Sequence, residues 1–467
     1  MNNDENIDIV LINPYNDKIV LRDFYSSTIS KGIYNWPNID LLCIASHLQK
    51  KFNVKIIDAN TEKIKASDIV KILNSYQLKG LIFSVGKSVL KDDYNFIKEI
   101  KNNLLKKVDI FVVGGVVYYN AIKELENNDF LDGCITNFVT DDILNYFLNK
   151  RENLKNIVLR NNKEIIDYGI ELPSNGFKIP IPPHNQLDLS KYKLSHGKYN
   201  FLTSVISSYG CPHKCSYCVS GKINYRYRDP DNIIQELDFL KKIGVREIIF
   251  KDNIFGFHKR IYKELLKKMI DKKYNFSWVS DSRVDILDEE ILQLMSKSGC
   301  HALHFGIETK NEKTLQNYNK NLKNINLVKE TIDLCRKHKI LTVGYFILGL
   351  PGETKKDVEN TIKYSVELDV DFASFNLPIP IIGTELREKS IKNNWITNNS
   401  SNYDGSNMPI ISTNELIPAE LKKLKSKAYK KFYFRIKFIC KNFLRIKNFF
   451  QLKMLILEFT NLIVKKH

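Results

Sequence analysis

The sequence predicts an α/β protein in which two series of parallel strands follow one another and a helical tail comes last. Short apolar segments alternate with amphipathic segments of about ten residues or more, and the whole alternation occurs twice. A Pro-rich stretch, KIPIPPHNQ, lies between the two series. The length of 467 residues also exceeds that of one ordinary domain.

Residues 1–150 form the first series. Apolar runs such as IDIVLINP and VKIIDA are separated by segments of helical spacing, including LLCIASHLQKKF and SDIVKILNSYQ. Short apolar strands between amphipathic helices indicate a parallel sheet covered on both faces, so we expect a Rossmann-like, doubly wound domain. Residues 151–199 are expected to be a linker packed on the surface, with a hairpin that turns at Asn161-Asn162.

Residues 200–393 form the second series. It contains six strand–helix repeats, from LTSVISSYG to FASFNLPIPI. Because a complete TIM barrel has about eight repeats, we expect an open, partial (βα)6 TIM-like barrel. Ligands would then bind at the C-terminal ends of its strands. Residues 394–467 are expected to be a basic, helical C-terminal region.

Three of the eight cysteines, Cys211, Cys215 and Cys218, lie within eight residues directly after the first strand of the second series. This spacing lets one short loop present three thiolates to an iron–sulfur cube and leaves the fourth iron free. A structural zinc site needs four ligands, no second CxxC pair occurs, and His213 inside the loop is cramped as a ligand. The scattered cysteines are expected to be ordinary buried residues: Cys43, Cys134, Cys300, Cys335 and Cys440.

A CxxxCxxC motif with an aromatic residue before its last cysteine, on the loop after the first strand of a partial barrel, resembles the radical S-adenosylmethionine (SAM) superfamily. Further segments that follow the next strands resemble the family over roughly residues 200 to 390. The resemblance implies a [4Fe–4S] cluster, held by the three cysteines, that reductively cleaves SAM to a 5′-deoxyadenosyl radical. It implies SAM contacts at Tyr217, Asp252, Asn253, Arg283, Gly306, Glu308, Ile347 and Gly349.

These SAM contacts have structural alternatives. In the family, the segment of Asp252 and Asn253 lies near the methionyl amine, but here the two residues could instead cap the following segment. Arg283 could pair with a nearby Asp, and Glu308 could form a structural salt bridge instead of binding the ribose. Gly349 could serve only to end a strand in a loop.

The first domain resembles the cobalamin-binding group of this superfamily. The segment Val112-Val113-Gly114-Gly115 matches a glycine pair after the fourth strand, and Ser84 and Asn13 match the ends of two other strands. The resemblance implies cobalamin contacts at Asn13, Ser84, Gly114 and Gly115. The chain departs from the pattern after the glycine pair and near the end of the domain, and no His lies between Asp58 and Ser84. A domain that keeps the fold without the ligand is the alternative.

The basic charge is concentrated in the tail. The net charge is +18, and residues 421–467 hold 14 Lys or Arg against one acid, Glu458, which leaves +5 for the first 420 residues. A nucleic-acid surface is therefore not expected. The tail could contact an anionic membrane surface or a lipid-like substrate. It could instead form a helix pair that closes the barrel with a solvated basic face, which we prefer.

The acidic start lacks the form of a signal peptide, and no apolar run approaches the roughly 20 residues of a membrane span. We therefore expect a cytoplasmic protein, with peripheral membrane contact through the tail left open. The resemblance implies an enzyme that needs a low-potential reductant such as flavodoxin or ferredoxin.

Methyl transfer from methylcobalamin to an unactivated carbon of a small molecule or lipid-like natural product is the preferred activity. A cobalamin-free cyclisation or rearrangement is the first alternative. A non-catalytic iron–sulfur scaffold or electron-transfer protein is the rival from another class. No residue identifies a catalytic proton donor or the substrate.

Overall fold

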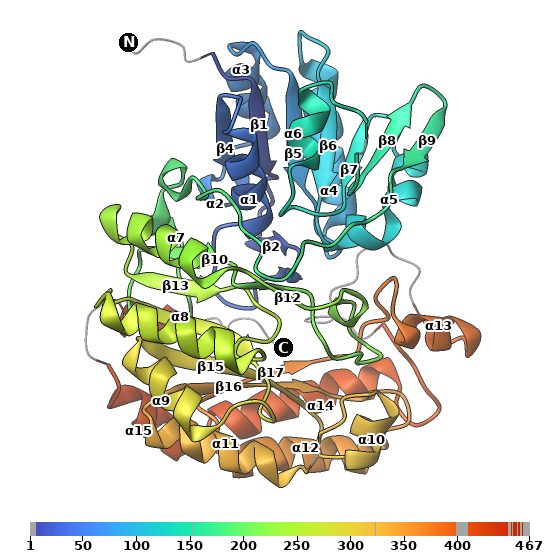
Figure 1. Ribbon diagram of the computed structural model, residues 1–467. Helices are drawn as coiled ribbons and strands as arrows, with labels where there is room; N and C mark the ends of the chain where they lie inside the picture. Colours follow the sequence, from blue (N-terminus) through green and yellow to red (C-terminus); the bar gives the residue numbers. More distant parts are fainter. Residues whose placement is uncertain are drawn as a thin grey trace.

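The computed structural model describes residues 6–152, 154–322, 324–397 and 410–446, together with 450, 452–454, 456, 457 and 460. Two sheets lie one above the other, and the C-terminal helices pack beside the lower one (Figure 1). The mixed α/β fold expected from the sequence is confirmed. In this part of the chain no helix combines the length and the apolar character needed to cross a bilayer.

The first sheet has seven strands in the order β4-β1-β5-β6-β7-β8-β9. Its first five strands are parallel, and the expected hairpin adds β8 and β9 as antiparallel strands at the edge. The strands are β1 (Ile9–Asn13), β4 (Val54–Asp58), β5 (Gly80–Ser84), β6 (Asp109–Val113), β7 (Gly133–Ile135), β8 (Ile157–Asn161) and β9 (Glu164–Asp167). The helices are α1 (Ile39–Leu48), α2 (Ala59–Glu62), α3 (Ala66–Asn74), α4 (Leu90–Asn103), α5 (Gly115–Asn127) and α6 (Asp142–Phe147).

A small antiparallel hairpin, β2 (Val20–Asp23) and β3 (Ser26–Ile29), follows β1 and lies between the first sheet and the second (Figure 1). An ion pair links the hairpin to the parallel sheet's helix α4: Arg22 Nη2 lies 2.8 Å from Asp93 Oδ1, and both side chains are fully buried. On its other side Tyr25 donates a hydrogen bond to the backbone carbonyl of Ser208, at 3.1 Å. The hairpin therefore joins the two domains.

The second sheet has six strands in the order β10-β13-β14-β15-β16-β17, and all neighbours are parallel. The expected partial barrel is confirmed. Its strands are β10 (Leu202–Val205), β13 (Glu247–Phe250), β14 (Ser277–Ser282), β15 (Cys300–Glu308), β16 (Leu341–Ile347) and β17 (Phe372–Asn376). Its helices are α7 (Pro230–Lys242), α8 (Lys259–Asp271), α9 (Glu289–Lys297), α10 (Glu312–Asn317), α11 (Asn326–Lys337), α12 (Lys355–Glu367) and α13 (Glu385–Lys392).

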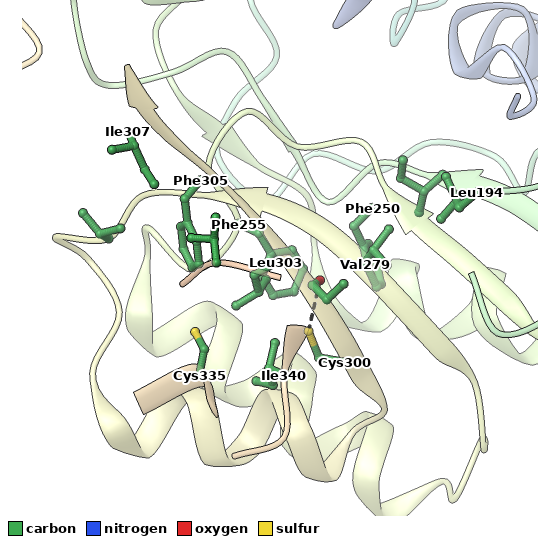
Figure 2. Close-up of a cluster of buried hydrophobic side chains, with 14 of the residues drawn as sticks. Leu194, Phe250, Phe255, Val279, Cys300, Leu303, Phe305, Ile307, Cys335 and Ile340 are labelled. Atoms are coloured by element: carbon green, nitrogen blue, oxygen red, sulfur yellow. Dashed lines mark hydrogen bonds between the residues drawn. The ribbon is translucent and has the colours of Figure 1, made fainter. Parts of the chain in front are cut away.

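Apolar side chains fill the space between the barrel strands and their helices. Phe250, Phe255 and Phe305 belong to this core, which Figure 2 shows in close-up. Cys300 and Cys335 lie in the same cluster, and the Cys300 thiol donates to the backbone carbonyl of Ala302. Cys43 and Cys134 are buried in the same way, so these four are ordinary buried cysteines as expected. The expectation was wrong for Cys440, which is exposed in the helix Ile436–Phe443.

Two C-terminal helices, α14 (Pro418–Tyr433) and α15 (Ile436–Phe443), follow the barrel. Helix α14 covers β17, the edge strand of the second sheet, with the rings of Tyr429 and Phe432 against Phe375. The Tyr433 hydroxyl donates to the carbonyl of Ala373 in β17, at 2.6 Å. This packing closes the side of the barrel that a seventh and an eighth repeat would otherwise occupy.

Candidate functional site

The cysteine loop rises from a short two-stranded ribbon. Strand β11 (Ser208–Tyr209) pairs with β12 (Arg226–Tyr227), so both ends of the loop are held together. Gly210 has a φ of +76°, and a Cβ on it would lie 2.5 Å from the carbonyl oxygen of Ile223. Only glycine combines this backbone conformation with that close approach. The loop is therefore fixed at its base before the first cysteine.

The three cysteines are half-buried, and their sulfurs lie close enough for the charges on Cys215 and Cys218 to raise the pKa of Cys211. Burial is the larger cause and raises that pKa to about 11, while Arg283 lowers it. A free thiol here stays protonated at neutral pH, which disfavours a nucleophilic role. Binding to a metal would release the thiol proton, because a cysteine binds a metal as the thiolate.

Unsatisfied polar atoms surround this loop. Tyr217 Oη, His213 Nε2 and Arg283 Nη1 are buried, and none has a hydrogen-bond partner within the described residues. A structural zinc site would need four protein ligands, and the cysteine loop supplies three thiols. Three thiols without a fourth protein ligand fit an iron–sulfur cube with one open corner.

One cavity of about 660 Å³ lies between the barrel and the first domain. Tyr217, Glu308 and Ile347 line it on the barrel side, so three of the expected SAM contacts share this space. Glu308 ends β15 with a left-handed φ of +66° and pairs with Lys320 at 3.0 Å. Backbone strain at a charged residue that faces a cavity is a common feature of ligand sites.

Asp252 and Asn253 support the cysteine loop and do not line the cavity. The Asp252 carboxylate accepts hydrogen bonds from the backbone N–H groups of Ser207 and Ser208, both at 2.9 Å. Burial raises the pKa of Asp252 to about 6. Asn253 accepts from the hydroxyl of Ser220 at 3.0 Å, at the far end of the loop. Both residues therefore position the cysteine loop, and the expected contact with the methionyl amine stays a prediction.

Arg283 is the expected site residue that the structure pairs with an Asp. Its Nε and Nη2 donate to Asp285 at 2.9 and 2.7 Å, and Nη2 also donates to the carbonyl of Lys320. Its positive charge still acts on the sulfurs of Cys211 and Cys215, whose pKa values it lowers. The ion pair with Asp285 thus keeps the positively charged guanidinium of Arg283 beside the cysteine loop.

The two expected glycines make room for neighbouring side chains. A Cβ on Gly306 would lie 2.4 Å from Glu308 Oε1, so the glycine admits the Glu308–Lys320 pair. A Cβ on Gly349 would lie 2.2 Å from a methyl group of Leu421 in α14, and its N–H donates to Glu353 at 3.1 Å. Gly349 therefore serves the packing of α14, and the structure does not place it on the cavity.

The four expected cobalamin contacts do not line this cavity, and their role stays a prediction. Asn13 and Ser84 are buried and bonded to each other at 3.1 Å, and Asn13 also donates to Asp58 at 2.8 Å. A Cβ on Gly114 would lie 2.3 Å from the carbonyl oxygen of Val85. A Cβ on Gly115 would lie 3.2 Å from that of Phe24. The glycine pair leaves room for the backbone of Val85 and Phe24, and the first domain lines the cavity with the β2–β3 hairpin, the segment of Tyr34 and Trp36, and Lys87.

A chain of polar side chains on the cavity wall was missed. His304 in β15 bonds Asp281 in β14 at 2.8 Å through Nδ1 and His196 at 3.0 Å through Nε2, while the Tyr345 hydroxyl lies 3.1 Å from Nδ1. All four line the cavity. Burial lowers the pKa of His196 well below its usual value, so this imidazole stays neutral. One signal was available, since His304, Gly306 and Glu308 alternate along one strand and share a face.

Comparison with known proteins defines the class. Residues 205–365 match the radical SAM superfamily, and the chain belongs to this superfamily, whose members hold a [4Fe–4S] cluster and use SAM. An uncharacterized methyltransferase of Pyrococcus horikoshii is 30% identical over 422 residues, which cover 87% of this chain and 90% of that protein.

Two solved structures share the two-domain fold. The radical SAM methyltransferase TsrM from Kitasatospora setae, with tryptophan and a SAM analogue bound, matches with a TM-score of 0.68 over 91% of this chain and 88% of that one, at 15% identity. The cobalamin-dependent radical SAM enzyme OxsB, with aqua-cobalamin bound, matches with a TM-score of 0.72 over 98% of this chain and 72% of that one, at 14% identity. At these identities the likeness is one of fold.

Proposed function

We propose that this protein is a cobalamin-dependent radical SAM methyltransferase that acts on a carbon atom of a small molecule. The observation that carries the proposal is the shared cavity, which side chains beside the cysteine loop and the β2–β3 hairpin of the first domain line together. A methyltransferase from Pyrococcus horikoshii resembles the chain over most of its length. TsrM and OxsB, which share the fold, are a radical SAM methyltransferase and a cobalamin-dependent enzyme.

In this proposal the three cysteines would hold a [4Fe–4S] cluster, which would pass an electron from the external reductant to bound SAM and so supply the 5′-deoxyadenosyl radical. SAM would bind on the cavity wall against Tyr217, Glu308 and Ile347. The ion pair with Lys320 would hold the Glu308 carboxylate in place. Arg283 would keep a positive charge next to the cluster.

The lining of the cavity favours a substrate with an apolar or aromatic body. Tyr34, Trp36, Phe372 and Tyr429 contribute aromatic surface, and Lys251 lies 4.3 Å above the Trp36 ring. The His196–His304 pair offers hydrogen bonds to a polar substituent. These features support a small or lipid-like organic substrate. A lipid-like substrate would also be consistent with membrane contact of the C-terminal helices, and we include a low-potential reductant such as flavodoxin or ferredoxin as a partner.

The first test addresses the cluster. Anaerobically reconstituted protein, reduced and given SAM, should hold about four irons per chain and release 5′-deoxyadenosine. Cys218→Ala should lose both properties. Cys440→Ala is the matched control, because this cysteine is exposed and remote from the loop, and it should keep both. Equal activity of the two variants would contradict the assignment.

The second test addresses cobalamin, with a cobalamin-free radical SAM enzyme as the other candidate. Asn13 and Ser84 are buried and bonded to each other, and Gly114 and Gly115 pack against the backbone carbonyls of Val85 and Phe24. Protein produced with hydroxocobalamin should carry about one corrinoid per chain by absorption spectroscopy if the methyltransferase proposal holds. Full iron content and SAM cleavage without any bound corrinoid would leave the radical SAM assignment intact and select the cobalamin-free candidate.

A further inference from the structure

Helix α15 exposes an apolar stripe to the surroundings of the protein. The exposed fractions are 81% for Ile436, 46% for Ile439, 69% for Phe443 and 83% for Leu444. Residues spaced by three, seven and eight positions lie on one face of a helix. A helix on the surface of a soluble protein normally turns such an apolar stripe toward the core.

The opposite face of α15 is mixed and points into the molecule. Phe438 packs its ring against Phe432 of α14, Lys441 pairs with Asp371 of the barrel at 2.9 Å, and Asn442 is buried. Asn442 and Arg445 line the cavity described above. The helix is therefore seated by Phe438 and this polar group, and the apolar stripe remains directed outward.

This part of the chain also concentrates the exposed apolar surface. Of the 13 large apolar side chains that are exposed in the described part of the protein, five lie between residues 434 and 444. Scattered exposed apolar residues are ordinary, whereas a contiguous group of them marks an interaction site.

The surroundings of the apolar face are strongly basic. Residues 421–446 contain ten Lys or Arg and no Asp or Glu. Lys430 and Lys431, at the end of α14, are exposed and come directly before the apolar face. Lys437 lies beside Ile436 on α15 and pairs with Asp369 at 3.0 Å. An apolar face flanked by lysines is complementary to an anionic lipid bilayer, which has negatively charged headgroups at its surface and acyl chains below them.

We propose that α15 docks on the surface of an anionic lipid bilayer, with Ile436, Ile439, Phe443 and Leu444 inserted at the level of the headgroups and Lys430 and Lys431 against lipid phosphates. A second copy of the chain is a poorer occupant, because a stable interface uses about 20–30 residues a side and α15 has eight. Docked in this way, α15 separates the bilayer from the cavity. The proposal does not depend on the methyltransferase activity.

The test is flotation of the full-length protein with vesicles of phosphatidylglycerol and phosphatidylcholine, compared with phosphatidylcholine alone. Ile436→Ser with Phe443→Ser should weaken binding by at least about tenfold per side chain. Lys430→Gln with Lys431→Gln should weaken it by about fivefold per lysine. Leu105→Ser is the matched control, because Leu105 is 86% exposed in the first domain, and it should bind as the wild type does. All substituted side chains are exposed, so thermal unfolding should be unchanged.

We expect the wild type to float with the anionic vesicles only. No binding of the wild type would overturn the proposal. Binding of the Ile436/Phe443 variant as strong as that of the wild type would also overturn it, because charge attraction alone would then explain the binding. If the wild type self-associates in sedimentation without binding lipid, and the same variant is monomeric, the face is an interface between copies and the proposal is wrong.

Discussion

A methyl group added at the first turn of the cysteine loop should disturb the cluster site. In Gly210→Ala the new Cβ would lie 2.5 Å from the carbonyl oxygen of Ile223 and 2.7 Å from that of Asn224. Both distances are below any that real Cβ atoms adopt, so the loop must shift by several tenths of an ångström. Since Cys211 is the next residue, its sulfur shifts as well.

The cost has two parts. The left-handed backbone costs an ordinary residue about 1–2 kcal/mol. Relief of the overlap in a packed site adds about 1–3 kcal/mol. We therefore expect Gly210→Ala to lower the free energy of unfolding by about 2–5 kcal/mol.

Gly244→Ala separates the backbone contribution to the lost stability from the overlap contribution. Gly244 has a φ of +85°, and nothing lies within 4 Å of the Cβ position, so this variant bears only the backbone cost. Urea unfolding should show a loss of about 1–2 kcal/mol for Gly244→Ala. Iron analysis should find full cluster content in Gly244→Ala and reduced content in Gly210→Ala. Equal stability and equal iron in the two variants would refute the reasoning.

Three further predictions concern residues outside the loop. Arg22→Met leaves Asp93 buried without its partner and should destabilise the protein by about 3–5 kcal/mol in urea unfolding, whereas replacing both residues with apolar ones should recover most of the loss. Burial raises the pKa of Glu353 from 4.5 to about 7, so the folded protein keeps a proton that the unfolded chain has released. Stability should therefore fall by up to about 3 kcal/mol as the pH rises through this window, and urea unfolding of Glu353→Gln should lack that slope. Nitrogen NMR should find His304 protonated at Nδ1, and Asp281→Asn should shift this tautomer; an unchanged spectrum would show that the carboxylate does not set it.

Much of the fold followed from periodicity. Parallel strands buried on both faces are continuous apolar runs, and their helices show the helical repeat, so both sheets could be read from the sequence. The hairpin at residues 157–167 was expected, but its addition to the first sheet was not. Which strand lies beside β7 is decided by packing between segments distant in the chain, so the local pattern of residues 157–167 could not place the hairpin there.

The sequence by itself determined the cysteine loop, because its three cysteines lie within eight residues directly after a strand. It also determined the two strand series, because each pattern is local. The tertiary structure alone decided which polar side chains reach the cavity. It turned Asn13 and Ser84 inward, and it brought Asp281, His196 and His304 together from separate elements. Burial and partnership between residues distant in the chain depend on strand order and packing, which no short segment contains.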